Sequence, residues 1–278
     1  MQHYAKKRFG QNFLVDNSII QHIVDCIQPQ AEDLMIEIGP GLGAMTKPLL
    51  SRLNHLHVIE LDRDIIPKLV KNCKFANAEN KNKLTVNEYD VLKFDFSAFH
   101  SKQNQSAESA GKKLRIVGNL PYNISTPVLF HLLNYRHLIE DMHFMLQKEV
   151  VERIVSTPSN KAYGRLSVMI QTFCTCQALL DVPPYAFEPA PKVNSSILRL
   201  QPNAQFEQQI DDFAAYETLV RQAFSQRRKT LKNTLKDACS TAQIENAGLL
   251  PSQRAEELSV ADFVRLYNSV IHNTIAQA

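Results

Sequence analysis

The chain has 278 residues, of which 44% are hydrophobic and 21% charged, and its net charge at pH 7 is +3. These values are ordinary for a soluble globular protein with one large domain, or with a large domain and a small one. Because the net charge is small, any affinity for nucleic acid must come from local clusters of basic residues.

Membrane, secreted and metal-binding proteins have features that this chain lacks. No stretch approaches the roughly 20 apolar residues of a membrane span, and no apolar stretch follows the charged N-terminus, as a signal peptide would require. The five cysteines are scattered and odd in number, which argues against a disulfide framework. Cys174 and Cys176 are too close together for a zinc site without a second pair. We therefore expect a cytoplasmic protein with no membrane segment and no metal.

Strand-like and helix-like patterns alternate through the first two-thirds of the chain. Apolar runs predict strands at 34–38, 56–61, 84–86, 114–118 and 142–146, and helical periodicity predicts helices at 44–52, 63–72 and 127–135. This alternation is typical of an α/β fold whose mainly parallel sheet has helices on both faces. Two later runs, 178–182 and 196–200, predict a hairpin that closes the sheet.

The loop after the first predicted strand, residues 37–44, is rich in glycine. Gly39 and Gly41 allow a tight turn and the close approach of a ligand to the backbone. Together with Ala44 they also match the dinucleotide-binding fingerprint, so the loop alone does not separate nicotinamide from other adenosine cofactors. Pro40 removes a backbone amide that a pyrophosphate would use, which favours a methyl donor over a hydride donor.

One acidic residue lies at the end of the second predicted strand, and another follows the third. Glu60 stands about 20 residues after the glycine loop, where a carboxylate can accept hydrogen bonds from a ribose diol. The alternative is a surface acid at a strand end. Asp90 could accept from an adenine amino group, although a helix cap or turn residue is an equally reasonable interpretation.

Residues 119–122, Asn-Leu-Pro-Tyr, end the fourth predicted strand. An amide side chain, backbone carbonyls and an aromatic ring at the rim of a sheet suit a planar base that carries an exocyclic amine. We expect the Asn119 oxygen and the Leu120 carbonyl to accept from the amine, and Tyr122 to stack on the base. The alternative is a strand that ends at Pro121, with Tyr122 packed locally.

A proline-rich segment at 183–193 contains Phe187. Its ring would stack on the second face of the base, or it would pack in the core beneath the prolines. Strand patterns end near residue 203, so we expect an α/β domain at 1–203 and a helical domain at 204–278.

Two segments concentrate positive charge. Residues 221–236 hold six basic groups and no acid, and as a helix they would align Arg228, Lys232 and Lys236 for phosphates, with Leu231 and Leu235 facing the protein. A solvated helix face, or a solvated N-terminus for the second segment, is the alternative. The predicted nucleic-acid contacts are Lys6, Lys7, Arg8, Arg221, Arg227, Arg228, Lys229, Lys232 and Lys236.

From about residue 6 to the C-terminus, the chain resembles the ribosomal RNA adenine dimethyltransferases, and most closely the bacterial small-subunit branch. The segments with this resemblance follow one another in the same order in that family: 7–14, 37–41, 58–62, 118–125 and 187–193. Their joint occurrence is highly specific. The resemblance implies a Rossmann-like class I methyltransferase with a seven-stranded sheet, an antiparallel last strand and a small all-helical C-terminal domain.

The resemblance also implies the chemistry. The cofactor would be S-adenosylmethionine, bound by Asn12, Leu14, Gly39, Gly41, Glu60, Asp90 and Asn119. The catalytic set would be Asn119, Leu120, Pro121, Tyr122 and Phe187. The substrate would be two adjacent adenines in the 3′-terminal hairpin of 16S ribosomal RNA, dimethylated at N6 by a monomeric enzyme within an assembling small ribosomal subunit.

Three other functions stay open. A large-subunit methyltransferase of the macrolide-resistance type is close, although the basic helical tail and residues 164–169 favour the small-subunit branch. A ribosome-assembly factor could bind without depending on its chemistry. A nicotinamide dehydrogenase would require a catalytic His or Lys near the fourth strand's end, and residues 119–125 contain neither.

Overall fold

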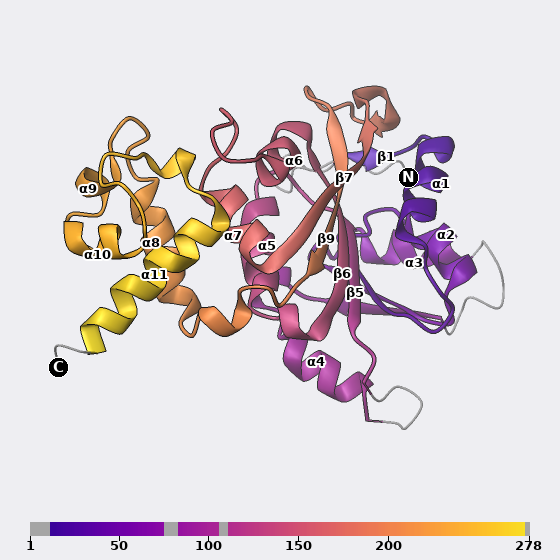
Figure 1. Ribbon diagram of the computed structural model, residues 1–278. Helices are drawn as coiled ribbons and strands as arrows, with labels where there is room; N and C mark the ends of the chain where they lie inside the picture. The colour runs from indigo at the N-terminus through magenta and orange to yellow at the C-terminus, as the bar shows by residue number, and fades with distance from the viewer. Residues whose placement is uncertain (1–11, 75–82, 106–110, 276–278) are drawn as a thin grey trace. The chain divides into compact units, whose positions relative to one another are not determined.

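The structure is a computed structural model that describes residues 12–74, 83–105 and 111–275 (Figure 1). Seven strands form one sheet in the order β4-β3-β2-β5-β6-β9-β7. The first five strands of this order run parallel, and β9 pairs antiparallel with β6, as predicted. The strands are β2 (Leu34–Ile38), β3 (Leu56–Glu60), β4 (Leu84–Glu88), β5 (Leu114–Asn119), β6 (Ile139–Gln147), β7 (Cys174–Val182) and β9 (Ser195–Pro202).

Helices cover both faces of the sheet (Figure 1). On one side lie α1 (Asn17–Ile27), α2 (Thr46–Arg52) and α3 (Ile66–Lys74), and on the other α4 (Phe96–Gln103) and α5 (Ser125–Leu133). Two of them, α1 and α4, were not predicted. Each begins at an aspartate whose carboxylate accepts from backbone N–H groups of the first turn: Asp16 caps α1 and Asp95 caps α4.

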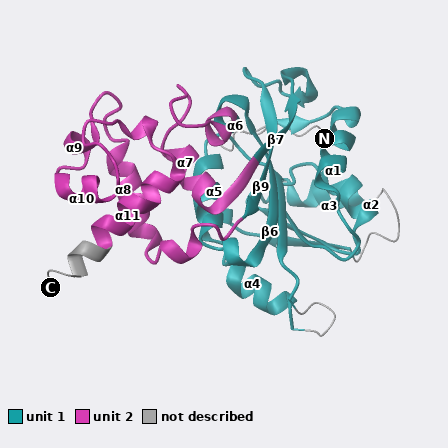
Figure 2. Cartoon of the chain, in the orientation of Figure 1, with its two compact units in different colours: residues 1–151, 177–202 teal, residues 152–176, 203–278 magenta. Residues whose placement is uncertain are grey.

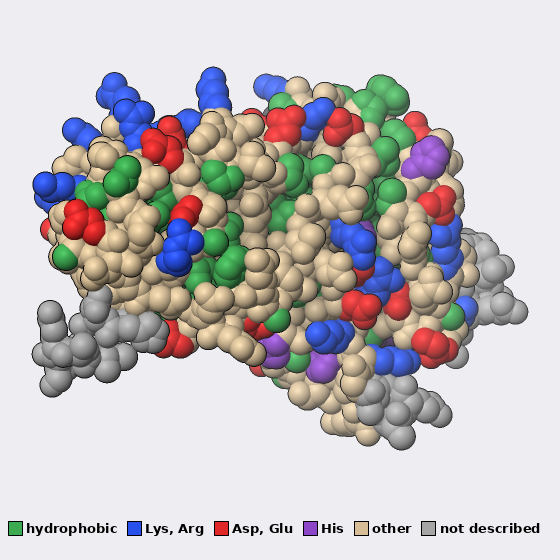
Figure 3. All heavy atoms as spheres, viewed as in Figure 1, with side chains coloured by type: hydrophobic (Ala, Val, Ile, Leu, Met, Phe, Trp, Pro, Cys, Tyr) green, Lys and Arg blue, Asp and Glu red, His purple; other side chains and the backbone are tan. Residues whose placement is uncertain are grey.

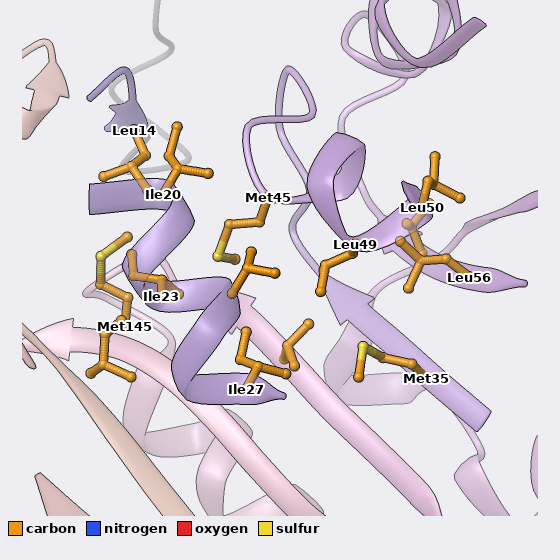
Figure 4. Close-up of a cluster of buried hydrophobic side chains, with 14 of the residues drawn as sticks. Leu14, Ile20, Ile23, Ile27, Met35, Met45, Leu49, Leu50, Leu56 and Met145 are labelled. Carbon is orange, nitrogen blue, oxygen red and sulfur yellow. The ribbon is translucent and has the colours of Figure 1, made fainter. Parts of the chain in front are cut away.

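The core beside α1 follows from the spacing of its apolar residues. Ile20, Ile23, Val24 and Ile27 recur every three or four positions and are all buried. They share one cluster with residues of the parallel strands, including Met145 of β6 (Figure 4). This packing holds α1, and the short β1 (Phe13–Leu14) that precedes it, against the sheet.

A second, two-stranded sheet joins distant parts of the chain. Strand β1 pairs antiparallel with β8 (Phe187–Glu188), so that Leu14 lies opposite Phe187. The backbone N–H of Val15 then donates to the carbonyl of Ala186 at 2.8 Å. The N-terminal segment and the proline-rich segment are therefore fixed to one another.

The chain divides into two compact units, residues 1–151 with 177–202 and residues 152–176 with 203–278 (Figure 2). One crossing falls at the expected boundary near residue 203. Residues 152–176, however, group with the C-terminal helices and not with the α/β part. Whether the units act as separate cofactor-binding and RNA-binding domains stays a prediction.

The second unit is helical. Its core includes Tyr216 and Thr172, whose hydroxyls lie 2.9 Å apart.

Among the described residues of the whole chain, no helix combines the length and apolar character that crossing a bilayer demands. The remaining helices are α6 (Lys148–Val155), α7 (Arg165–Phe173), α8 (Phe213–Ala223), α9 (Leu231–Thr234), α10 (Thr241–Asn246) and α11 (Val260–Ile275), and the 3-10 helices are η3 (Val91–Lys93), η4 (Arg136–Leu138), η5 (Pro184–Ala186), η6 (Glu207–Gln209) and η7 (Ala255–Glu257).

The prediction of one helix through 221–236 is wrong. Helix α8 ends at Ala223, and α9 is a single turn. The N–H groups of Leu231 and Lys232 donate instead to the carbonyls of Gln253 and Pro251, at 2.8 and 3.1 Å, which turns the chain. Leu231 and Leu235 are nevertheless buried as expected. Basic side chains still gather on this unit's surface near α9 (Figure 3).

Strands β2 and β5 leave no room for a side chain at position 118, at the end that leads into the loops. Ile38 pairs with Gly118, and a Cβ added to Gly118 would lie 2.5 Å from the Ile38 carbonyl oxygen. Real Cβ atoms do not approach this near, so the position requires glycine. Its lack of a side chain lets the glycine loop after β2 adjoin the residues that follow β5.

We predict that Gly118→Ala lowers the free energy of unfolding by about 1–3 kcal/mol or more, because two strands of a packed core must move apart. Denaturant titration of the purified protein measures this change. Gly164→Ala is the matched control, since nothing lies within 4 Å of the added Cβ and its backbone is extended. Equal stability of the two variants would contradict the close approach.

Candidate active site

A cavity of about 580 Å³ opens at the carboxyl ends of β4, β3, β2 and β5, within the first unit. The strand order reverses here, with β3 on one side of β2 and β5 on the other, and open α/β sheets bind ligands at such a point. The structure brings ten predicted residues together around this cavity. They are Asn12, Leu14, Gly39, Gly41, Glu60, Asp90, Asn119, Leu120, Pro121 and Tyr122.

The glycine loop forms the floor that a cofactor would approach. Gly39 and Gly41 have φ values of +66° and +55°, a region that other residues rarely adopt. The N–H of Gly39 donates to the Ile59 carbonyl at 2.9 Å, which fastens the loop to β3. A Cβ at Gly41 would also press on the Phe13 ring at 3.2 Å. The loop therefore depends on glycine for both conformation and space.

Asn119 is held in one orientation by the N-terminal segment. Its Nδ2 donates to the backbone carbonyl of Asn12 at 3.0 Å. Only the amide nitrogen can donate to a carbonyl, so this bond also assigns the position of Oδ1. The Leu120 peptide is fixed as well, because its N–H donates to the Met145 carbonyl at 3.3 Å. Oδ1 of Asn119 is thereby left as an acceptor at the cavity.

Tyr122 is half-buried and anchored at its hydroxyl. The phenol oxygen lies 2.8 Å from Oγ of Ser195, which is itself fully buried on β9. Burial raises the pKa of Tyr122, so the hydroxyl stays protonated and the bond persists at neutral pH. The segment then turns, as the N–H of Ile124 donates to the Pro121 carbonyl at 3.1 Å. The Tyr122 ring is therefore positioned at the rim by contacts at both ends of the residue.

Three carboxyl groups, those of Glu37, Glu60 and Asp90, line the cavity, and Glu37 was not predicted. Glu60 accepts from the N–H of Asp62 at 2.8 Å, and burial raises its pKa. Glu37, at the end of β2, is 1% exposed and accepts from Oγ1 of Thr46 at 2.7 Å. Burial raises the pKa of Glu37 to about 7, with a further contribution from the charge of Glu60. Glu37 stands at the start of the glycine-rich segment 37–44, but its sequence neighbours do not distinguish it from a structural residue at a strand end.

Asp90 lines the cavity and also caps a turn, so the cap is confirmed and the contact with an adenine amine stays a prediction. Its Oδ1 accepts from the N–H of Leu92 at 3.0 Å at the start of η3. Beside it, Tyr89 and Leu61 line the cavity although they are 50% and 51% exposed. These apolar side chains next to predicted polar contacts were missed, because a lone exposed residue gives no pattern in a sequence.

Phe187 lies elsewhere. Its side chain is 4% exposed, belongs to the hydrophobic core and is not among the described residues that line the cavity. This position matches the alternative of a core aromatic ring. Stacking of Phe187 on a base would require its ring to be uncovered, and stays a prediction.

The basic residues are partly outside the described structure. Lys6, Lys7 and Arg8 lie outside the described residues. The six of the C-terminal segment are all exposed, and Arg227 pairs with Glu256 at 3.3 Å. In the described part of the chain, no group of three or more His, Cys, Asp or Glu side chains is arranged to hold a metal ion.

Comparison with known proteins decides between the possible adenosine cofactors. Residues 2–272 match the family described as Ribosomal RNA adenine dimethylase. The chain belongs to this family. It is 49% identical over 271 residues to Ribosomal RNA small subunit methyltransferase A of Haemophilus influenzae, covering 98% of this chain and 92% of that one, and 48% identical to the protein of the same name from Yersinia pseudotuberculosis, covering 96% and 93%.

Solved structures agree with this assignment. A dimethyladenosine transferase from Plasmodium falciparum matches with a TM-score of 0.73 and 26% identity, covering 91% of this chain and 95% of that one. The 23S rRNA methyltransferase ErmE matches with a TM-score of 0.65 and 22% identity, covering 94% and 100%, which supports the fold alone. The predicted class I methyltransferase fold is confirmed. The dimethylase is an enzyme with S-adenosylmethionine as its cofactor.

The cavity's donors and acceptors fit that cofactor. A carboxylate at the end of the second parallel strand suits a ribose diol, and the Gly39–Gly41 turn leaves room for a ligand against the backbone. The exposed apolar side chains of Leu61 and Tyr89 suit the faces of an adenine ring.

We predict that the raised pKa of Glu37 makes stability depend on pH. The folded state holds the Glu37 proton up to about pH 7, whereas the ordinary carboxyl pKa is 4.5, so the free energy of unfolding falls as pH rises between these values. The total change should be about 3 kcal/mol, and Glu37→Gln should lack it. Denaturant titrations at several pH values measure the difference between the two proteins.

The comparison of wild type with Glu37→Gln is needed because two histidines also make stability depend on pH in this range. Burial lowers the pKa of His57 and of His143 to about 4. Glu32→Gln, at an exposed carboxyl, is the control and should follow the wild type. If the free energy of unfolding changed with pH equally in wild type and Glu37→Gln, Glu37 would be ionised in the folded state and the prediction would be wrong.

Proposed function

We propose that the dimethylase converts two adjacent adenines in the 3′-terminal hairpin of 16S ribosomal RNA to N6,N6-dimethyladenosine, during assembly of the small subunit. The observation that carries this proposal is the meeting of Gly39, Glu60, Asp90 and Asn119, from four neighbouring strand ends, around one cavity. The identity of 48–49% to small-subunit methyltransferases supports the choice of RNA.

Cofactor binding is assigned to the residues along the strand ends. Glu60 would accept from the ribose diol, and Oδ2 of Asp90 would accept from the adenine amine, because Oδ1 already caps η3. Asn12, Leu14 and the glycine turn would enclose the remainder. The cofactor supplies a methyl group already activated on a sulfonium, so the protein needs neither a metal nor a covalent intermediate.

The protein must make a poor nucleophile react. The lone pair of an adenine amine is delocalised into the ring, and it turns toward the methyl group only when the N–H bonds are held elsewhere. Oδ1 of Asn119 and the Leu120 carbonyl would accept those bonds, and bonds to the N-terminal segment and to β6 hold the two residues. Positioning of this kind can supply about 7–11 kcal/mol.

The same acceptors stabilise the product of the transfer. Positive charge develops on the amine nitrogen as the new bond forms, and preoriented dipoles interact with it favourably. Asn119 is neutral and therefore orients the amine without removing its proton, which is lost to water. In the second methyl transfer one of these acceptors would hold the amine, because N6-methyladenine retains one N–H.

The base would be held by its faces. Tyr122, anchored through Ser195, is placed to stack on one face, and stacking contributes about 1–3 kcal/mol per base. This compensates for the few kcal/mol that extrusion of a base from its stack costs. Phe187 is proposed as the ring for the opposite face, a role that requires its side chain, 4% exposed, to be uncovered.

RNA would be bound through exposed basic residues of the second unit. Arg228, Lys229 and Lys232 lie on the turn and short helix between 224 and 234, where they present charge without forming one helical face. Arg221, Arg227 and Lys236 extend this surface, and Lys6, Lys7 and Arg8 are proposed as contacts of the N-terminal segment. A monomeric state and a cytoplasmic location also stay predictions.

Two other functions are less well supported. The likeness to a large-subunit methyltransferase is 22% identity, far below that to the small-subunit proteins. A role in assembly without catalysis would not require the glycine turn and Asn119 to meet. Labelled S-adenosylmethionine, unmethylated small subunits and mass mapping of the products test the proposal: labelled N6,N6-dimethyladenosine should appear at two adjacent positions, and its absence would refute the assigned reaction.

We predict that Asn119→Ala lowers the rate of methyl transfer about 10²–10³-fold, the range observed for loss of one preoriented hydrogen bond at a reacting centre. Cofactor binding, followed by calorimetry, should remain measurable, because Gly39, Glu60 and Asp90 are unchanged. Asn134→Ala, an exposed amide at the end of α5, serves as the control. Turnover close to that of the wild type would remove Asn119 from the reaction.

We predict that RNA affinity falls steeply with salt, and that Arg228→Ala with Lys232→Ala reduces the slope of log K against log salt by about 0.7–0.9 for each phosphate that the variant no longer neutralises. Filter binding of a hairpin RNA at several salt concentrations measures the slope. Lys113→Ala, exposed at the opposite end of β5 from the cavity, should leave the slope unchanged. An unchanged slope in the double variant would exclude these phosphate contacts.

A further inference from the structure

Tyr185 is an exposed aromatic residue on a rigid turn of the backbone. Its side chain is 74% exposed, the highest fraction among the large hydrophobic residues described. It belongs to η5, where Pro184 restricts the backbone and the N–H of Ala186 donates to the Pro183 carbonyl at 3.1 Å. The next residue, Ala186, is fully buried. The exposure of Tyr185 is therefore imposed by a packed turn.

The turn formed by η5 adjoins the cavity. The Ala186 carbonyl, one residue after Tyr185, accepts from the N–H of Val15 at 2.8 Å, and Val15 lines the cavity. Val15 is itself 48% exposed, so two exposed apolar side chains, those of Val15 and Tyr185, stand close to this hydrogen bond. Hydrophobic side chains are visible at the top of Figure 3, over the turn between β7 and β9.

In the proposed reaction, the base next to the target adenine loses a stacking partner, and an exposed aromatic ring could replace it. Extruding one adenine into the cavity breaks its stacking with the neighbouring base, which costs a few kcal/mol. When the two target adenines are adjacent, the waiting base is left with an uncovered face at the rim. An aromatic ring recovers stacking with any base, because every base has a π-face.

We propose that the Tyr185 ring stacks on the adenine adjacent to the one in the cavity and holds it there while its neighbour is methylated. This proposal rests on the proposed dimethylation of two adjacent adenines. Lys192 is exposed in the same proline-rich segment and could contact the phosphate of the held nucleotide. Tyr185 is thus a positioning and binding residue that does not touch the reacting atoms.

Steady-state kinetics on unmethylated small subunits test this role. Tyr185→Ala should raise KM about five- to tenfold, at the lower end of what one stacked base contributes, and leave kcat within about twofold. Tyr185→Phe should retain the wild-type KM, because stacking needs the ring and not the hydroxyl. His137→Ala, exposed at the opposite end of the sheet, is the matched control.

A fluorescent probe tests the contact itself. The chain contains no tryptophan, so Tyr185→Trp introduces a single indole. Titration with a hairpin RNA that carries the two adenines should quench this fluorescence, and an abasic residue in place of the waiting adenine should abolish the quenching. His137→Trp should show little quenching with either RNA.

The outcomes separate the two proposals. A wild-type KM for Tyr185→Ala, or unquenched Tyr185→Trp, would overturn the stacking role. A raised KM on small subunits without quenching by RNA would assign the ring to a ribosomal protein and also overturn it. If the wild type fails to methylate small subunits, the proposed function fails, while the quenching titration still reports on the ring.

Discussion

The approach of β2 and β5 at Ile38 and Gly118 is the constraint on which the site depends. It places the end of the glycine loop beside the start of the Asn-Leu-Pro-Tyr segment, since parallel neighbours release their following loops at one edge. A side chain at Gly118 would push the strands apart. The glycine turn and the Asn-Leu-Pro-Tyr segment would then no longer share one cavity.

The site residues of the first unit were largely predictable because they follow strands. An apolar run fixes where a parallel strand ends, and the residue after it reaches the common rim. Glu60, Asp90 and Asn119 were located in this way, and all three line the cavity. Glu37 was missed because a buried acid inside a strand has the same local pattern as a structural residue, and its surroundings become visible only in three dimensions.

Features that depend on distant partners were not predictable. The basic segment looks helical by spacing, yet Leu231 and Lys232 bond to carbonyls 19 or more residues away, at Pro251 and Gln253. Helix α4 was not predicted because its sequence is polar, and its start depends on the Asp95 carboxylate, which accepts from the N–H groups of Ser97 and Ala98. Phe187 showed why a motif does not determine exposure: the pairing of β1 with β8 buries the ring that chemistry would place on a base.

The central claim is that Asn119 and Leu120 hold an adenine amine beside a methyl donor bound over the glycine turn. A crystal structure of the protein with S-adenosylhomocysteine and a short RNA containing the two adenines tests it most directly. The account predicts N6 of one adenine within hydrogen-bond distance of Asn119 Oδ1 and the Leu120 carbonyl oxygen, with the cofactor sulfur in the same cavity. An adenine bound elsewhere, or a cofactor remote from Gly39 and Gly41, would contradict it.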